Sequence, residues 1–159
     1  MSLIVQKFGG SSVADAEKLM HAVYITKGTY RAGNAVAVVV SAQGDLTDRL
    51  LEKARELSQE PPSRELDALL AAGEQCSAAL YAQALIAQGV PAVSLCGWQV
   101  PIRTDSSYGD AEIESVGRGR IRRELDAGRV VVVAGFQGVS GTGDITTLGR
   151  GGSDTRGWQ

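Results

Sequence analysis

A lysine followed by two glycines near the N-terminus has the composition of an anion-binding turn. The segment reads Lys7, Phe8, Gly9, Gly10, Ser11 and Ser12. It follows a short apolar run and precedes a helical pattern, so we expect it to join a strand to a helix. Glycines let a backbone approach an anion, and a helix N-terminus supplies N–H donors with a partial positive charge. A tight turn beside a solvated lysine would have the same sequence, so both interpretations stay open.

Other phosphate-binding motifs are missing from the chain. It contains no Walker-type Gly-Lys-Ser/Thr sequence and no Gly-x-Gly-x-x-Gly sequence at a strand-to-helix junction. Their absence disfavours a P-loop fold and a dinucleotide-binding fold.

A carboxylate within an apolar helical pattern is the second group that could do chemistry. Glu74 follows Gly73, and its helical neighbours are Leu69, Leu70, Ala78 and Ala79. A carboxylate near a core is costly unless it is paired. We therefore expect Glu74 to meet a cation, which either the protein or a ligand could supply.

Two further loops carry polar groups. Ser41 and Thr47 supply hydroxyls in a second strand-to-helix loop, where helix capping by Asp45 or Thr47 would explain most of the sequence. Near the end of the chain, Arg150 precedes two glycines, and its planar guanidinium suits a carboxylate. A surface loop is the alternative interpretation for this glycine-rich segment.

Other charged residues are assigned no role. We expect Arg118, Arg120, Arg122 and Arg123 to form a solvated helix surface, and His21 to pack within the first helix.

Composition indicates one soluble globular domain. The chain has 159 residues, of which 43% are hydrophobic and 21% charged. A net charge of −2 gives no case for nucleic-acid binding, and no apolar run is long enough for a membrane span. The N-terminus does not resemble a signal peptide. Cys76 and Cys96 lack metal-type spacing, so we expect no metal site and two buried free thiols in a reducing cytoplasm.

Four apolar runs must position these groups. They are residues 3–5, Ala35–Val40, Ala92–Leu95 and Val130–Ala134. Their apolar character is continuous rather than alternating, which is typical of strands covered on both faces. Helical patterns separate them, so the sequence predicts an α/β fold with a mostly parallel sheet flanked by helices on both faces.

The expected helices have recognisable ends. Ser12 with Asp15 fits a capping signal for a helix that continues to about Tyr30. A second helix carries Leu46, Leu50, Leu51, Ala54 and Leu57. A third, long helix extends from about Leu66 to near Gly89, and a fourth covers residues 114–127. Residues 100–104 are expected to add a short antiparallel strand.

The carboxyl ends of the four strands all lead into small, polar, glycine-rich loops. In open α/β sheets, ligands bind beyond those ends. The loops after residues 8, 40, 95 and 134 are therefore expected to form one site.

Together the loop sequences resemble the aspartokinase branch of the amino acid kinase family. The matching segments cover nearly the whole chain in the family's order: residues 5–13, 38–42, 44–48, 73–75, 97–99, 102–105, 131–138 and 146–154. The set is specific, because sister kinases acting on glutamate, carbamate or uridylate share the fold but not all of these sequences. The chain departs from the family at Ser11, usually a threonine, and at Gln43, commonly a methionine.

The resemblance implies ATP-dependent phosphorylation of L-aspartate to 4-phospho-L-aspartate, a step of lysine, threonine and methionine biosynthesis. It implies that Lys7 faces the transferring phosphoryl group, with Gly9, Gly10, Ser11 and Ser153 at the phosphates. Glu74 would bind the substrate's ammonium and Arg150 its carboxylate, while Ser41, Thr47 and Phe136 complete the pocket. Asp154 would organise the lysines, and Mg²⁺ would arrive on the nucleotide.

Relatives in this family continue beyond the position of Thr155 with a nucleotide-binding lobe and regulatory domains. We therefore expect residues 1–159 to form a single, incomplete kinase domain, the amino-acid-binding lobe. Alone it should show no appreciable turnover, and uncovered apolar surface should make it a homo-oligomer, with the second and third helices as one possible interface. A non-catalytic amino-acid-binding or oligomerising remnant, or a kinase for another small carboxylate, remains the alternative.

Overall fold

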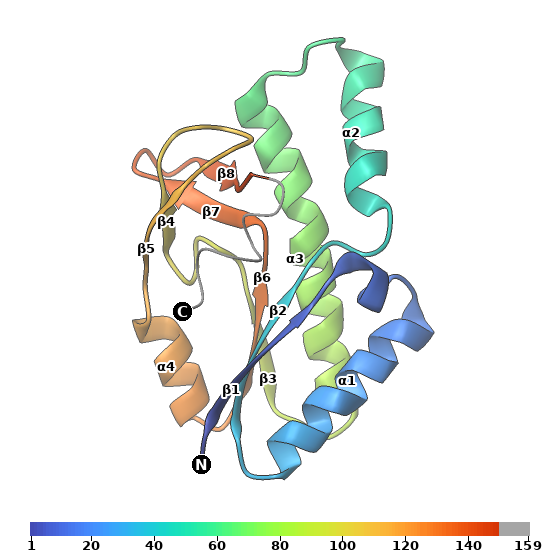
Figure 1. Cartoon of the computed structure of the whole chain (residues 1–159), viewed down its shortest axis with the longest axis vertical. Coiled ribbons are helices and arrows are strands. Elements are labelled where there is room, and N and C mark those ends of the chain that lie inside the picture. Colours follow the sequence, from blue (N-terminus) through green and yellow to red (C-terminus); the bar gives the residue numbers. More distant parts are fainter. Residues whose placement is uncertain (150–159) are drawn as a thin grey trace.

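The centre of the molecule is a parallel sheet of four strands (Figure 1). A computed structural model of the chain describes residues 1–149. The strands are β1 (Leu3–Phe8), β2 (Ala35–Val40), β3 (Ala92–Leu95) and β6 (Val130–Ala134), in the order β1-β2-β6-β3. All three pairings are parallel, as continuous Val-rich runs predict. The predicted fold class is thereby confirmed.

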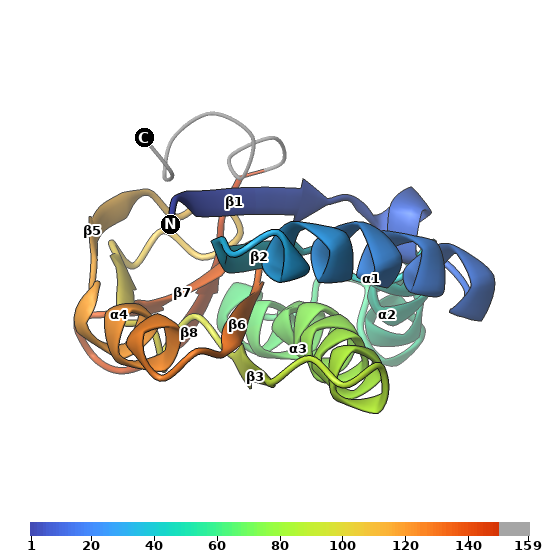
Figure 2. The same ribbon diagram turned by 90° about the horizontal axis from the view of Figure 1, so that it is seen from below.

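The two faces of this sheet are covered differently (Figure 2). On one face, Val36, Val38 and Val132 pack with residues of α1 (Ala16–Arg31) and α3 (Ser63–Ala87) in the larger core. On the other face, Val131 and Val133 belong to a second core, which also contains apolar residues of α4 (Gly119–Asp126). The parallel strands thus lie between layers, apart from the exposed N-terminal half of β1.

A second, smaller sheet was not predicted. It contains β4 (Ile102–Thr104), β5 (Ile113–Val116), β7 (Gln137–Ser140) and β8 (Ile145–Thr147), in the order β5-β4-β7-β8. The strand expected at residues 100–104 is present as β4, antiparallel to β5 but parallel to β7. The helix expected at residues 114–127 was wrong at its start, because residues 113–116 pair with β4 and the helix begins at Gly119.

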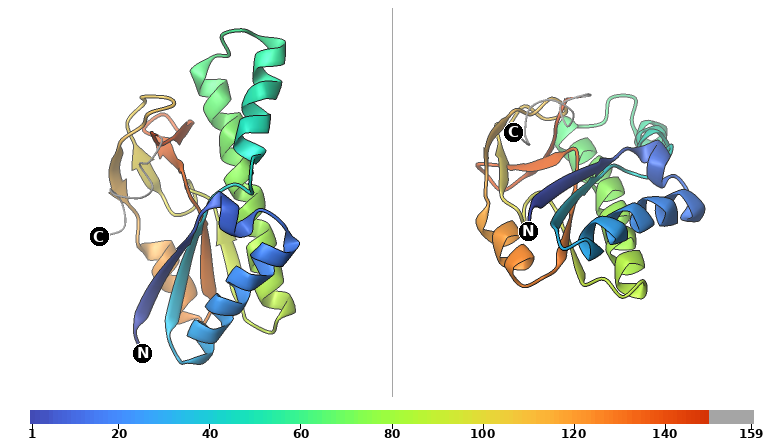
Figure 3. Two further views of the ribbon diagram at one scale, coloured as in Figure 1. Left: turned by 45° about the vertical axis from the view of Figure 1, so that its right-hand side comes forward. Right: turned by 60° about the horizontal axis from the view of Figure 1, so that its bottom comes forward.

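Two helices extend beyond the carboxyl ends of the strands (Figure 3). They are α2 (Leu46–Leu57), which has no buried residue, and the first half of α3. The short helix η1 (Gly10–Val13) precedes α1 and contains Ser12. Asp15, not Ser12, caps α1, since its side chain accepts a hydrogen bond from the Lys18 N–H.

The two cysteines differ from the expectation in part. Both are free, but Cys76 is exposed on α3 and only Cys96 is buried. Across residues 1–149, none of the helices combines the length and hydropathy that a membrane crossing requires.

Candidate functional site

The loops that follow β1, β2 and β6 are hydrogen-bonded to one another. The Gly44 N–H donates to the Gly10 carbonyl at 2.9 Å, and the Ser41 N–H donates to the Phe8 carbonyl at 3.1 Å. Gly135, directly after β6, donates to the Val40 carbonyl at 2.9 Å. The structure therefore brings these loops together at the carboxyl edge of the sheet, as parallel strands require.

The two glycines after β1 have different surroundings. A Cβ atom on Gly10 would lie 2.6 Å from the Ala42 carbonyl oxygen, so this glycine is required by the packing of two loops. A Cβ on Gly9 would meet no described atom within 4 Å, and the φ of Gly9 is an ordinary −73°. Neither backbone conformation nor packing against residues 1–149 explains a glycine at position 9. Open space beside a backbone turn is what an approaching anion needs.

Lys7 and Ser11 lie on either side of this turn. Lys7 is the penultimate residue of β1, is exposed, and pairs with Val39 of β2. Ser11 is exposed within η1. A lysine, an open glycine and the start of a helical segment thus occupy one corner of the carboxyl edge.

Glu74 is buried but only half satisfied. Its side chain comes from the middle of α3, and the residue is 3% exposed. Oε1 accepts a hydrogen bond from the Ala42 N–H at 3.2 Å, whereas Oε2 has no partner among residues 1–149. Burial raises the pKa of Glu74 to about 7, against the opposing effect of the Ala42 hydrogen bond. No cation within residues 1–149 pairs with this carboxylate.

Asp67 is a second buried carboxylate on α3, and the sequence analysis missed it. It is 1% exposed, and both oxygens are satisfied. Oδ1 accepts from the Thr147 hydroxyl at 2.8 Å, and Oδ2 accepts from the N–H groups of Thr147 and Gly109 at 2.8 and 3.0 Å. The sequence signal for Asp67 was the same as that for Glu74, because both are acidic residues in an apolar helical pattern. Asp67 lies seven positions before Glu74. Asp67 joins α3 to β8, so its role is structural.

Phe136 has a backbone conformation that non-glycine residues rarely adopt. It follows Gly135 between β6 and β7 with φ +64°, in the left-handed region. Its carbonyl accepts from the Leu148 N–H at 3.0 Å. Such strained residues cluster at binding sites. The next residue, Gln137, is buried and links the Gly97 N–H to the Ala71 carbonyl, so it connects this loop with α3.

Of the remaining site residues expected from the sequence, some lie within the described residues and others outside them. Ser41 and Thr47 are half-buried, Ser41 directly after β2 and Thr47 in the first turn of α2. Arg150, Ser153 and Asp154 lie outside the described residues. Residues 1–149 contain no group of three His, Cys, Asp or Glu side chains arranged to hold a metal ion.

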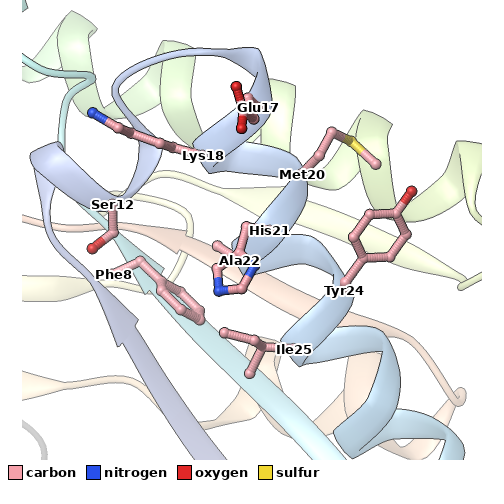
Figure 4. A pocket seen from close by; sticks show the side chains of 9 residues that line it. All are labelled: Phe8, Ser12, Glu17, Lys18, Met20, His21, Ala22, Tyr24 and Ile25. Atoms are coloured by element: carbon pink, nitrogen blue, oxygen red, sulfur yellow. The ribbon is translucent and has the colours of Figure 1, made fainter.

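A cavity of about 710 Å³ adjoins the loop after β1 (Figure 4). It lies between α1 and the end of β1, and Phe8 and Ser12 belong to its lining. His21 also lines it. This residue lies on the first helix, as expected, but it is exposed, so the expectation that it is packed was wrong.

Comparison with known proteins gives consistent matches. The profile of the amino acid kinase family matches residues 2–156. The chain is 52% identical to an aspartokinase of Geobacillus stearothermophilus over 155 residues, 98% of this chain and 38% of the relative. It is 54% identical to an aspartokinase of Mycolicibacterium smegmatis over 156 residues, 98% of this chain and 37% of the relative. The chain therefore spans a little over a third of the length of these relatives.

Solved structures agree with the sequence matches. The aspartate kinase of Synechocystis superposes with a TM-score of 0.79 at 45% identity, over 96% of this chain and 25% of that one. Aspartokinase III of E. coli, solved in complex with aspartate and ADP, superposes with a TM-score of 0.79 at 25% identity, over 97% of this chain and 45% of that one.

Proposed function

The chain belongs to the amino acid kinase family, and on that premise we propose that it forms the aspartate-binding part of an aspartate kinase. The reaction transfers the γ-phosphoryl group of ATP to the β-carboxylate of L-aspartate, giving 4-phospho-L-aspartate and ADP. The relatives named aspartokinase and the E. coli structure with aspartate and ADP support this choice of substrates.

The observation that carries the proposal is the carboxylate of Glu74. It is buried, faces the loop after β2 and has one oxygen without a partner in the described part of the chain. An ammonium group is the ligand that would complete it, because an ammonium supplies both the missing donor and the compensating charge. An amino acid fits this requirement, whereas a simple dicarboxylate does not.

The other groups follow from the chemistry of phosphoryl transfer. A β-carboxylate oxygen attacks the γ-phosphorus while the bond to the β,γ-bridging oxygen breaks, and charge spreads over the transferring group. We propose that Lys7 and the backbone around Gly9, Gly10 and Ser11 stabilise that charge. Ser41, Thr47 and Phe136 would border the substrate, Arg150 would bind its carboxylate, Ser153 would contact phosphate and Asp154 would organise the lysines. Mg²⁺ would accompany the nucleotide phosphates.

Titration of the chain with L-aspartate and succinate tests the proposal. Succinate has both carboxylates but no ammonium, so it should bind far more weakly than L-aspartate. Glu74→Gln should weaken L-aspartate binding by roughly one to two decades, because a charge-assisted hydrogen bond is lost. Arg122→Ala, on the exposed side of α4, should bind like wild type. Equal binding of the two ligands, or no effect of Glu74→Gln, would contradict amino-acid recognition, and binding of succinate alone would favour another small carboxylate.

Turnover is proposed to need more than these residues. The chain spans 37–38% of its aspartokinase relatives, and phosphoryl transfer requires the nucleotide to be held in line. We expect no appreciable aspartate-dependent ADP release in a coupled assay with Mg²⁺ and ATP. Turnover at roughly 1–100 s⁻¹, usual for kinases, would contradict this.

Location and assembly complete the proposal. The two free thiols fit a reducing compartment, so we propose that the protein works in the cytoplasm. We also propose that it forms a homo-oligomer and binds neither nucleic acid nor membrane.

A further inference from the structure

A chain of hydrogen bonds crosses the interior from α3 to β1. The Tyr81 hydroxyl, fully buried on α3, lies 2.8 Å from the Thr26 hydroxyl of α1. The Thr26 hydroxyl donates to Gln6 Oε1 of β1 at 2.6 Å, and Gln6 Nε2 donates to the Thr29 hydroxyl at 2.9 Å. The Thr29 hydroxyl in turn donates to the Ile25 carbonyl at 3.1 Å.

The direction of this chain is fixed by the number of protons. Thr26 has a single hydroxyl proton and gives it to Gln6, so Tyr81 must be the donor to Thr26. Burial raises the pKa of the Tyr81 hydroxyl above its ordinary value, which keeps that donor proton in place. Every member then donates onward, and such chains strengthen each bond by polarisation.

Tyr81 makes a second contact with the same strand. Its ring is stacked on the ring of Phe8, with centroids 5.8 Å apart and an interplanar angle of 28°. Gln6 and Phe8 are two residues apart, so they point to the same face of β1 and flank Lys7. Tyr81 therefore holds both neighbours of Lys7, one through Thr26 and one directly.

These contacts matter because few other elements hold β1 in position. Within the described part of the chain, its one strand partner is β2, and its N-terminal half is exposed. The position of β1 relative to α3 therefore depends on contacts with the layer of α1 and α3, which covers one face of the sheet (Figure 1). Tyr81 follows Glu74 by seven residues, two turns of the same helix face. One helix thus orients Glu74 itself and the strand that carries Lys7.

We propose that Tyr81 is a positioning residue that fixes the Lys7 end of β1 relative to Glu74, through its hydroxyl contact to Thr26 and Gln6 and its ring contact to Phe8. The inference rests on the proposed function only in assigning Lys7 to the phosphates and Glu74 to the amino acid. The role of the hydroxyl is separable from that of the ring, because a phenylalanine would keep the stacking.

Hydrogen exchange of Tyr81→Phe tests the positioning directly. The Ser41 N–H donates to the Phe8 carbonyl, so its exchange rate reports opening of the end of β1. The variant should exchange this amide roughly three- to tenfold faster, the expected effect of one lost neutral hydrogen bond. Amides of the central strand β6 should exchange as in wild type. Tyr24→Phe is the matched control, since Tyr24 is an exposed tyrosine on α1 outside the chain of hydrogen bonds.

Equal acceleration in β1 and β6 would overturn the proposal, because it would show a general loss of stability. An unchanged Ser41 rate would overturn it as well. Titration with pyrophosphate and with L-aspartate adds a second comparison: Tyr81→Phe should weaken pyrophosphate binding roughly threefold or more and leave L-aspartate binding unchanged. If wild type binds neither ligand, the proposed function fails, while the exchange rates still decide the role of Tyr81.

Discussion

At the scale of single residues, Glu74 carries an electrostatic cost that Asp67 avoids. Both are buried on α3, but Asp67 accepts three hydrogen bonds and Glu74 accepts one from another residue. A buried acceptor without a partner destabilises the folded state, and a bound ligand removes that cost. The same carboxylate should therefore weaken the free protein and strengthen the complex.

The pH dependence of stability should reveal this cost. The pKa of Glu74 is about 7 in the folded protein and 4.5 as the ordinary value, so the folded state binds more protons between these pH values. The free energy of unfolding should therefore fall as pH rises from about 4.5 to 7 and level off above that. We expect the free energy of unfolding of Glu74→Gln, relative to that of wild type, to increase by about 1–3 kcal/mol as the pH rises from 5 to 8, measured by urea unfolding. Glu56→Gln, exposed on α2, should show no such gain; a gain independent of pH would refute the assignment.

The two glycines after β1 give a second prediction at this scale. Gly10→Ala places a Cβ against the Ala42 carbonyl and should lower the free energy of unfolding by about 1–3 kcal/mol. Gly9→Ala has room for its Cβ and should keep or slightly raise stability, by up to about 1 kcal/mol. It should nevertheless weaken pyrophosphate binding, measured by calorimetry, because the methyl group occupies the approach to the backbone. Wild-type binding by Gly9→Ala would mean that this turn is only structural.

At the scale of elements, α3 connects the loops of the site. Asp67 binds β8 and the Gly109 turn, the Ala71 carbonyl binds Gln137, and Glu74 binds the loop after β2. Helix α3 therefore determines the relative positions of loops that are distant in sequence.

Asp67→Asn tests this connecting role. An amide retains the size of the carboxylate, but one of its two ends cannot accept the N–H or hydroxyl donors around it. We expect the free energy of unfolding to fall by about 2–4 kcal/mol, with faster exchange of the Thr147 amide than of β6 amides. Asp126→Asn at the exposed end of α4 provides the comparison. A loss below about 1 kcal/mol would contradict the role assigned to Asp67.

Elements were predicted correctly where the local sequence pattern and the tertiary packing favour the same secondary structure. Residues 35–40 and 130–134 are Val-rich and form the buried strands, as their continuous apolar runs indicate. Residues 114–116 were assigned to a helix, yet Ile113 and Val116 pack against the second core as part of β5. Only the tertiary partner, β4, decides this segment.

The same distinction holds for the site. Glu74 was found because a buried charge is visible in an apolar pattern. The packing of Gly10 against Ala42 and the bond from Tyr81 to Thr26 were not predicted, because these pairs of residues lie 32 and 55 positions apart in the sequence. No local pattern specifies such contacts.

At the scale of the whole molecule, β1 presents an exposed edge. Leu3, Ile4 and Val5 are 57%, 36% and 48% exposed, and β2 is the one strand paired with β1 among residues 1–149. Exposed apolar edge strands favour association. This surface is a stronger candidate for self-association than α2, whose main exposed apolar residue is Leu57.

Light scattering at micromolar concentration should show a homodimer or larger oligomer. Val5→Lys should shift the protein towards monomer, because a charge on an edge strand opposes pairing. Leu57→Lys should leave the assembly unchanged if β1 forms the interface, and should dissociate it if α2 and α3 do. A stable wild-type monomer would refute self-association altogether.

The spacing of polar residues on α3 restricts how this helix can change during evolution. Asp67, Glu74 and Tyr81 follow one another at intervals of seven, and each contacts a different part of the protein. Seven residues complete two turns to within about 20°, so these side chains remain on one face. Insertion or deletion of a single residue would rotate everything beyond it by about 100° and separate the two halves of that face. Related sequences should therefore vary in length within the loops on either side of α3 but conserve the number of residues between Asp67 and Tyr81.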